Sequence, residues 1–128
     1  MVNRDEYINE LLKWKQDNLI KVITGIRRCG KSTLLKLFAE HLKKNGVDDE
    51  QIISINFEDI KNEKLMDYRT LYEYIEDRIV EGKWTYVLLD EIQNVREFQK
   101  AIDSLFVKDN VDIYITGSNA YMLSGRLA

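Results

Sequence analysis

A segment of the form G-x-x-x-x-G-K-S, running from Gly25 to Ser32, constrains the fold of this chain more than any other feature. It lies between a β-rich run at residues 19–24 and an apolar pattern at helical spacing that begins near Lys31. Its glycines let the backbone curl around an anion, with successive N–H groups at the positive end of a helix dipole. We therefore expect a strand, a phosphate-binding loop and a helix; the alternative is a chance turn with two glycines and a lysine.

The side chains of this loop suit the terminal phosphates of a nucleoside triphosphate. Lys31 would reach the β- and γ-phosphates, and Ser32 offers a hydroxyl ligand to the Mg²⁺ ion that bridges them. The residues expected to contact the nucleotide are Gly25, Arg28, Cys29, Gly30, Lys31, Ser32 and Thr33. For Arg28, and for Arg27 beside it, contact with phosphate, base or a partner chain and simple solvation both remain open.

An acidic pair follows the hydrophobic run at residues 85–89. Asp90 and Glu91 would stand at the C-terminal end of a strand, where α/β sheets bind their ligands, and their mutual repulsion is offset if a cation binds there. We expect Asp90 to hold Mg²⁺ through a water molecule and Glu91 to polarise the water that attacks the γ-phosphate. A solvated acidic turn is the alternative.

Polar residues also end two other predicted strands. Ser118 or Asn119, after the last strand, is expected to hydrogen-bond the γ-phosphate or the attacking water, unless these residues only cap a following helix. Asn56, at the end of the second strand, would either pair with Glu91 and hold it inactive until a partner binds, or serve as a turn residue.

Strands alternate with helices along the whole chain. The periodicity predicts strands at 19–24, 51–57, 85–89 and 112–116, and helices at about 4–16, 31–45, 71–80 and 98–106. Thr70 and Glu73 are spaced as a capping box for the third helix. Parallel strands need crossover connections, and helices supply them here, so the fold class is α/β with a parallel sheet of about four strands covered on both faces.

The composition fits one globular domain. The 128 residues are 45% hydrophobic and 32% charged, and the net charge of −3 gives no general basic field for nucleic acid or anionic membranes. The single cysteine rules out an internal disulfide, and no Cys/His cluster has zinc-ligand spacing. The first residues lack a signal peptide's basic start and apolar middle, and no run approaches the ~20 apolar residues of a membrane span. We expect a cytoplasmic protein that does not bind membranes.

Three blocks together resemble the prokaryotic AAA+-type P-loop ATPases. They are a Walker A block at residues 22–32, a Walker B block at residues 88–93, and residues 116–120, in the order of that family. The resemblance implies a three-layer fold in which the fourth strand lies between the first and the third. It implies ATP, with Mg²⁺, rather than GTP. It also implies a catalytic set of Glu91, Lys31, Ser118 and Asn119, with the sensor at one of the last two.

The two ends of the chain carry separate expectations. Apolar residues at helical spacing predict an N-terminal amphipathic helix within residues 1–17. The resemblance implies that residues 18–128 form an ATPase core that stops before the family's fifth strand and its C-terminal region. An arginine finger beyond residue 128 would then be absent, and hydrolysis by this part alone would be weak. The first strand would form an unprotected sheet edge, so we expect self-association through residues 19–23 or cover by the N-terminal helix.

The leading interpretation is a Mg²⁺-dependent ATPase core that acts as the motor or switch of a larger protein. One alternative is a nucleotide-dependent switch or binding module with little hydrolysis. Another is a DNA-dependent ATPase, because residues 90–93 fit the D-E-x-Q pattern of helicases, although helicases need a second motor domain. The remodelled substrate, any protein or nucleic-acid partner and the oligomeric state stay open.

Overall fold

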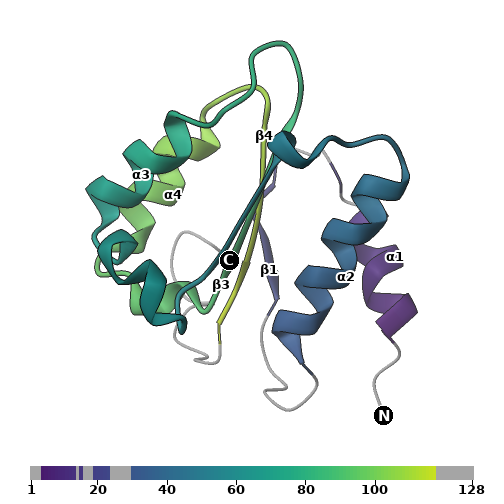
Figure 1. Ribbon diagram of the computed structural model, residues 1–128, viewed down its shortest axis with the longest axis horizontal. Coiled ribbons are helices and arrows are strands. Elements are labelled where there is room, and N and C mark those ends of the chain that lie inside the picture. The colour runs from purple at the N-terminus through teal and green to yellow at the C-terminus, as the bar shows by residue number, and fades with distance from the viewer. Residues whose placement is uncertain (1–3, 14, 16–18, 24–29, 118–128) are drawn as a thin grey trace.

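The computed structural model describes residues 4–13, 15, 19–23 and 30–117 of the chain (Figure 1). The helices are α1 (Arg4–Lys13), α2 (Lys31–Lys44), α3 (Tyr68–Glu76) and α4 (Phe98–Phe106). The strands are β1 (Lys21–Ile23), β2 (Ile52–Asn56), β3 (Thr85–Asp90) and β4 (Val111–Thr116). Short 3-10 helices occupy η2 (Asp49–Gln51), η3 (Ile60–Leu65) and η4 (Ile92–Asn94).

These strands form one parallel sheet in the order β1-β4-β3-β2. Helices α1 and α2 cover one face, and α3 and α4 cover the other (Figure 1), so the described part of the chain has three layers. The predicted α/β class is confirmed. So is the position of the fourth strand between the first and the third, which only the resemblance implied.

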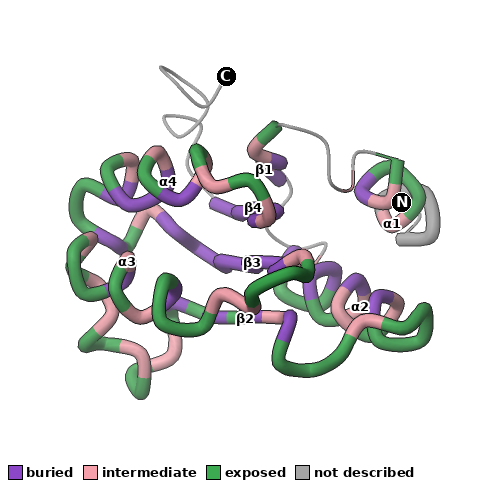
Figure 2. The backbone as a smooth tube through the Cα atoms, turned by 90° about the horizontal axis from the view of Figure 1, so that it is seen from above, coloured by how far each residue is buried: buried purple, intermediate pink, exposed green. Residues whose placement is uncertain are grey.

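The two central strands are buried along their whole length. Every residue of β3 and β4 is buried (Figure 2), as expected for parallel strands covered on both faces. Successive side chains of a strand point to opposite faces, so Val87 and Leu89 pack towards α3 and α4 while Tyr86 and Leu88 pack towards α1 and α2. The sheet therefore separates two hydrophobic clusters and holds its C-terminal edge rigid between them.

A buried ion pair joins the edge strand β1 to β4. Lys21 Nζ lies 2.5 Å from Asp112 Oδ1, and the Tyr114 hydroxyl donates a hydrogen bond of 2.8 Å to Asp112 Oδ2. The Lys21 and Asp112 side chains are 6% and 0% exposed, and Lys21 Nζ also lies 5.2 Å from the centroid of the Tyr114 ring. Because both charges are removed from water, each depends on the other for compensation.

Several element boundaries differ from the sequence-based expectations. β1 begins at Lys21 instead of residue 19, α1 ends at Lys13 before a turn at Lys15, and α3 spans residues 68–76 instead of 71–80. The boundaries of α2, β2, β3, α4 and β4 agree with the predicted ranges to within one or two residues. The exact ends depend on capping contacts, which hydrophobic periodicity does not encode.

The capping box predicted at Thr70 and Glu73 is wrong. α3 begins three residues earlier, and its N-cap is Asp67, whose carboxylate accepts hydrogen bonds of 3.0 Å from both the backbone N–H and the hydroxyl of Thr70. These hydrogen bonds, led by the one from the Thr70 backbone, hold the pKa of Asp67 below its usual value. An aspartate at this position accepts from the first turn, so Thr70 is a donor within the helix and not its cap.

Candidate functional site

The candidate site lies where the N-terminus of α2 meets the C-terminal ends of β3 and β4. Gly30, directly before α2, has φ 70° and ψ 61°, a left-handed conformation that is accessible to glycine without the penalty other residues incur. Lys31 is the first residue of the helix and is buried, at 7% exposed. The helix therefore starts where the sequence pattern predicts, with the lysine at its positively polarised end.

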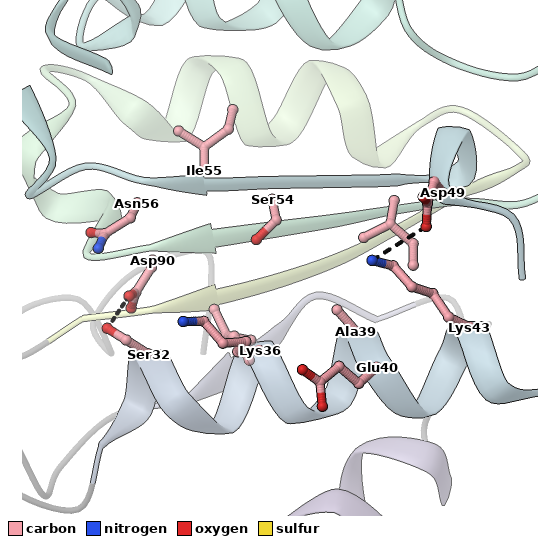
Figure 3. A pocket seen from close by; sticks show the side chains of 12 residues that line it. Ser32, Lys36, Ala39, Glu40, Lys43, Asp49, Ser54, Ile55, Asn56 and Asp90 are labelled. Carbon is pink, nitrogen blue, oxygen red and sulfur yellow. Dashed lines mark hydrogen bonds and ion pairs between the residues drawn. The ribbon is translucent and has the colours of Figure 1, made fainter. Parts of the chain in front are cut away.

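Ser32, in the first turn of α2, lies in contact with Asp90, the last residue of β3. The Ser32 hydroxyl donates a hydrogen bond to Asp90 Oδ2 (Figure 3), although 58 positions separate the two residues in the sequence. Asp90 is 4% exposed, so this carboxylate lies inside the protein and is held in one orientation. The two residues predicted to bind a metal thus lie next to each other.

Thr116, the last residue of β4, connects the two acidic residues. Its hydroxyl donates a hydrogen bond to Asp90 Oδ1 and accepts one of 2.9 Å from the backbone N–H of Glu91. Thr116 is fully buried. The sequence analysis missed this residue because it considered the polar residues beyond the strand; the available signal was that a threonine ends the strand predicted to adjoin the third.

Glu91 is buried at the end of β3 in a strained backbone conformation. Its φ of 57° is left-handed, which is uncommon for a residue with a side chain, and it is 8% exposed. Its Oε1 accepts a hydrogen bond of 2.6 Å from Gln93 Nε2, and its carbonyl accepts from both the backbone N–H and the side-chain amide of Asn94. The turn after β3 therefore folds back onto Glu91.

Asn56 takes the turn role that was left open for it. It lies beside Asp90 in the parallel register of β2 and β3. Its Oδ1 accepts a hydrogen bond of 2.9 Å from the Glu58 backbone, and its carbonyl accepts from Asn62. A hydrogen bond between Asn56 and Glu91 is not among the contacts of the described residues, so this structure does not support Asn56 as the residue that holds Glu91.

The other predicted site residues fall into two groups. Thr33 is exposed in the first turn of α2, next to Ser32. Six residues lie outside the described part of the chain: Gly25, Arg27, Arg28, Cys29, Ser118 and Asn119. The structure thus brings together Lys31, Ser32, Asp90 and Glu91 and leaves the rest of the predicted nucleotide contacts as expectations.

A pocket of about 450 Å³ extends from this site along the groove between α2 and β2 (Figure 3). Ser32, Asp90 and Asn56 line one end, and Lys43, which pairs with Asp49 at 3.2 Å, lines the other. The groove therefore runs along the edge strand β2, from the Lys43–Asp49 ion pair to the Ser32–Asp90 contact.

The remaining pKa shifts lie on the α3 and α4 side of the sheet. The hydrogen bond from Lys100 to Glu97, with N and O 2.7 Å apart, raises the pKa of Lys100. A hydrogen bond with Tyr72 is the main cause that raises the pKa of Lys108, and Glu76 contributes as well. Each of these two lysines is therefore paired with an acidic neighbour on that side of the sheet.

The donor set at Ser32 and Asp90 fits magnesium. Mg²⁺ takes oxygen ligands and keeps several waters, so proteins often supply only one or two ligands while phosphates supply others. A hydroxyl and a carboxylate oxygen in contact meet that requirement. Among the described residues, no group of three or more His, Cys, Asp or Glu is placed to hold a metal, so a site built entirely from such residues is not found in that part of the chain.

The parallel sheet, the glycine that precedes α2 and the Lys31, Ser32 and Asp90 arrangement define a protein of the α/β P-loop NTPase class. The chain belongs to the AAA domain family, whose sequence model matches residues 17–128. This membership indicates a nucleotide-binding, ATPase-like function. None of the described helices is both long and apolar enough to cross a membrane.

Two relatives extend this comparison. An uncharacterized protein of Haemophilus influenzae is 40% identical over 129 residues, which cover 100% of this chain and 32% of that protein. Uncharacterized protein MJ1637 of Methanocaldococcus jannaschii is 28% identical over 123 residues, covering 89% of this chain and 26% of that protein. The chain therefore spans about a third or less of the length of the curated relatives it matches.

Proposed function

We propose that this chain binds Mg-ATP and hydrolyses it, as the ATPase core of a motor or switch in a larger protein. The observation that carries the proposal is the contact between Ser32 and Asp90, which joins the phosphate loop to the acidic strand end at one point. Family membership supports the nucleotide-binding part of the proposal. The preference for ATP is what the resemblance to AAA+-type ATPases implies, and the dependence on Mg²⁺ and the hydrolysis step are inferred from the chemistry of these residues.

The binding step uses the N-terminus of α2. The backbone N–H groups of its first turn have no partner within the helix, and the helix dipole makes this end attractive to phosphate. Lys31, the first residue of the helix, would add a positive charge that acts on the β- and γ-phosphates. Ser32 and Asp90 would hold Mg²⁺, which when bound neutralises charge on the phosphates.

The hydrolysis step depends on the acidic pair. A water molecule attacks the γ-phosphorus, Glu91 accepts the proton that the water loses, and the bond from the γ-phosphorus to the bridging β,γ-oxygen breaks to give ADP and phosphate. Thr116 would keep Asp90 and the backbone of Glu91 in a fixed relation during this step, because its hydroxyl bonds to both. Lys31 would stabilise the charge that develops on the phosphoryl oxygens.

The second candidate is a nucleotide-dependent switch that hydrolyses ATP slowly. Glu91 favours it, because this carboxylate is 8% exposed and already accepts a hydrogen bond from Gln93. A base in this state is poorly placed to meet a water molecule. The ratio of steady-state phosphate release to nucleotide affinity separates the two candidates: tight binding with slow release indicates the switch.

Calorimetry with Mg-ATP on the wild type and on Lys31→Ala tests the proposal. We expect Lys31→Ala to weaken binding about ten- to a hundredfold, because a hydrogen bond to a charged group contributes about 1.5–3 kcal/mol. Lys44→Ala, on an exposed residue in the last turn of the same helix, is the matched control and should bind as the wild type does. Equal affinity of the wild type and Lys31→Ala would refute the assignment.

A further inference from the structure

Gln93 makes a direct contact with the carboxylate that the proposed reaction needs. Its Nε2 donates to Glu91 Oε1 at 2.6 Å, a short distance for an amide and a carboxylate. A carboxylate only accepts hydrogen bonds, so the nitrogen of the amide must face Glu91 and the oxygen must point elsewhere. The orientation of the Gln93 side chain is thus set by Glu91.

This orientation leaves the other end of the amide unsatisfied. Among the described residues, Gln93 Oε1 is the buried side-chain polar atom that has no hydrogen-bond partner. A buried carbonyl oxygen without a donor is unfavourable, and native structures contain few of them. The contact with Glu91 therefore leaves the carbonyl oxygen of the same amide buried without a donor.

The backbone around Gln93 is held by buried neighbours, whereas its side chain is only partly buried. The neighbouring residues Ile92 and Val95 are 0% and 1% exposed and belong to the core against α3 and α4. Gln93 itself is only partly buried. Rotation of its side chain can therefore move the amide away from Glu91 without moving η4.

Glu91 does not line the groove that leads to the site. Among the described residues, Ser32 and Asp90 line the pocket between α2 and β2, whereas Glu91 is not one of its lining residues. A general base must reach the water whose proton it takes, at hydrogen-bond distance. In the present arrangement one oxygen of Glu91 is instead occupied by an amide of its own turn.

We propose that Gln93 is a positioning residue that holds Glu91 in a resting orientation, and that rotation of its amide releases Glu91 for the reaction. This inference rests on the proposed ATPase function. The sequence analysis considered Asn56 for such a role, but Asn56 is used in a turn and Gln93, two residues beyond the glutamate, makes the contact. The released amide would gain a donor for Oε1, which compensates for the lost contact.

The test compares ATP hydrolysis by the full-length natural protein with that of Gln93→Ala and Gln93→Met. Both variants lack the amide donor, and methionine keeps a similar side-chain length without adding a charge beside Glu91. We expect kcat to rise about tenfold in both, the size of effect that loss of a hydrogen bond to a charged group produces. KM for ATP and the melting temperature should stay at the wild-type values, because Gln93 contacts no phosphate-binding residue in the described contacts.

Two further variants control the result. Gln99→Ala makes the same substitution at a partly buried glutamine of α4 and should leave kcat unchanged. The double variant Gln93→Ala with Glu91→Gln should hydrolyse no faster than Glu91→Gln alone, since the gain requires Glu91. A gain that persists in the double variant would overturn the inference.

Failure of this inference is distinguishable from failure of the proposed function. Hydrolysis by the wild type with an unchanged or lower kcat in Gln93→Ala would overturn the role of Gln93 and leave the ATPase proposal intact. Binding of ATP without detectable hydrolysis in the wild type and in every variant would overturn both. A fall in kcat together with a lower melting temperature would show that Gln93 is structural.

Discussion

The hydroxyl of Thr116 donates a hydrogen bond to the carboxylate of Asp90 across the neighbouring strands β4 and β3. The same hydroxyl accepts from the backbone N–H of Glu91. One fully buried side chain therefore holds both the carboxylate of Asp90 and the backbone of Glu91 at the end of the sheet.

Thr116→Val should disturb the site while preserving the shape of the side chain. The valine leaves Asp90 and the Glu91 N–H without this partner, so we expect the free energy of unfolding to fall by about 1–3 kcal/mol. Half-maximal hydrolysis should require a higher magnesium concentration, because Asp90 then keeps only its contact with Ser32. Thr116→Ser keeps the hydroxyl and should restore the magnesium dependence; a valine variant with wild-type magnesium dependence contradicts the role assigned to Thr116.

Glu91→Gln should separate binding from turnover. The amide can still position a water molecule but cannot accept its proton, so we expect ATP affinity to be kept and hydrolysis to fall by about 10²–10⁴-fold. Asp90→Asn should instead weaken the magnesium dependence, because it removes a charged ligand of the ion. Calorimetry and phosphate release measure these effects, and hydrolysis by Glu91→Gln at the wild-type rate would mean that the base lies elsewhere.

Asp112→Ala should strongly destabilise the fold. It removes the carboxylate that pairs with the buried Lys21 ammonium, and we expect the free energy of unfolding to fall by about 3–5 kcal/mol. The double variant Lys21→Met with Asp112→Leu removes both charges and should recover most of the loss. Urea denaturation tests this, and a double variant as unstable as Asp112→Ala would show that the ion pair itself is needed.

The N-cap of α3 predicts a pH dependence. Because hydrogen bonds lower the pKa of Asp67 in the folded state, its contribution to stability is present above the unfolded value near 3.8 and is lost as the pH falls through the lower folded value. Asp67→Asn keeps a capping oxygen that does not titrate, so its melting temperature should fall less in acid than that of the wild type. Asp77→Asn, at the other end of α3, is the matched control.

We propose that the chain self-associates through the edge at β1. β1 lies at one end of the described sheet, and Leu19 just before it is 51% exposed. Exposed strand edges pair with other chains, and a lysine there opposes this pairing. Light scattering should therefore show oligomers that Leu19→Lys shifts towards monomer, whereas Ile60→Lys, at an 81% exposed loop position, should not. A wild type that is monomeric at high concentration would refute the proposal.

The local pattern of the sequence predicted the elements of this fold. The start of α2 at Lys31, the strands before and after it, and the α/β class follow from the glycine loop and from the periods of apolar residues. Asp90 and Glu91 were identified because an acidic pair directly follows a buried strand. These features depend on residues that are close together in the chain, so they can be predicted from the sequence alone.

Contacts between distant segments were decided only by the tertiary structure. The Ser32–Asp90 contact and the hydrogen bonds of Thr116 depend on strand order and register, which determine the side chains that meet at the edge of the sheet. The contact of Gln93 with Glu91 and the role of Asp67 as the N-cap of α3 were not predicted, for a different reason. Each is close to its partner in sequence, but the choice between neighbouring polar residues depends on backbone dihedral angles that burial of the surrounding core imposes.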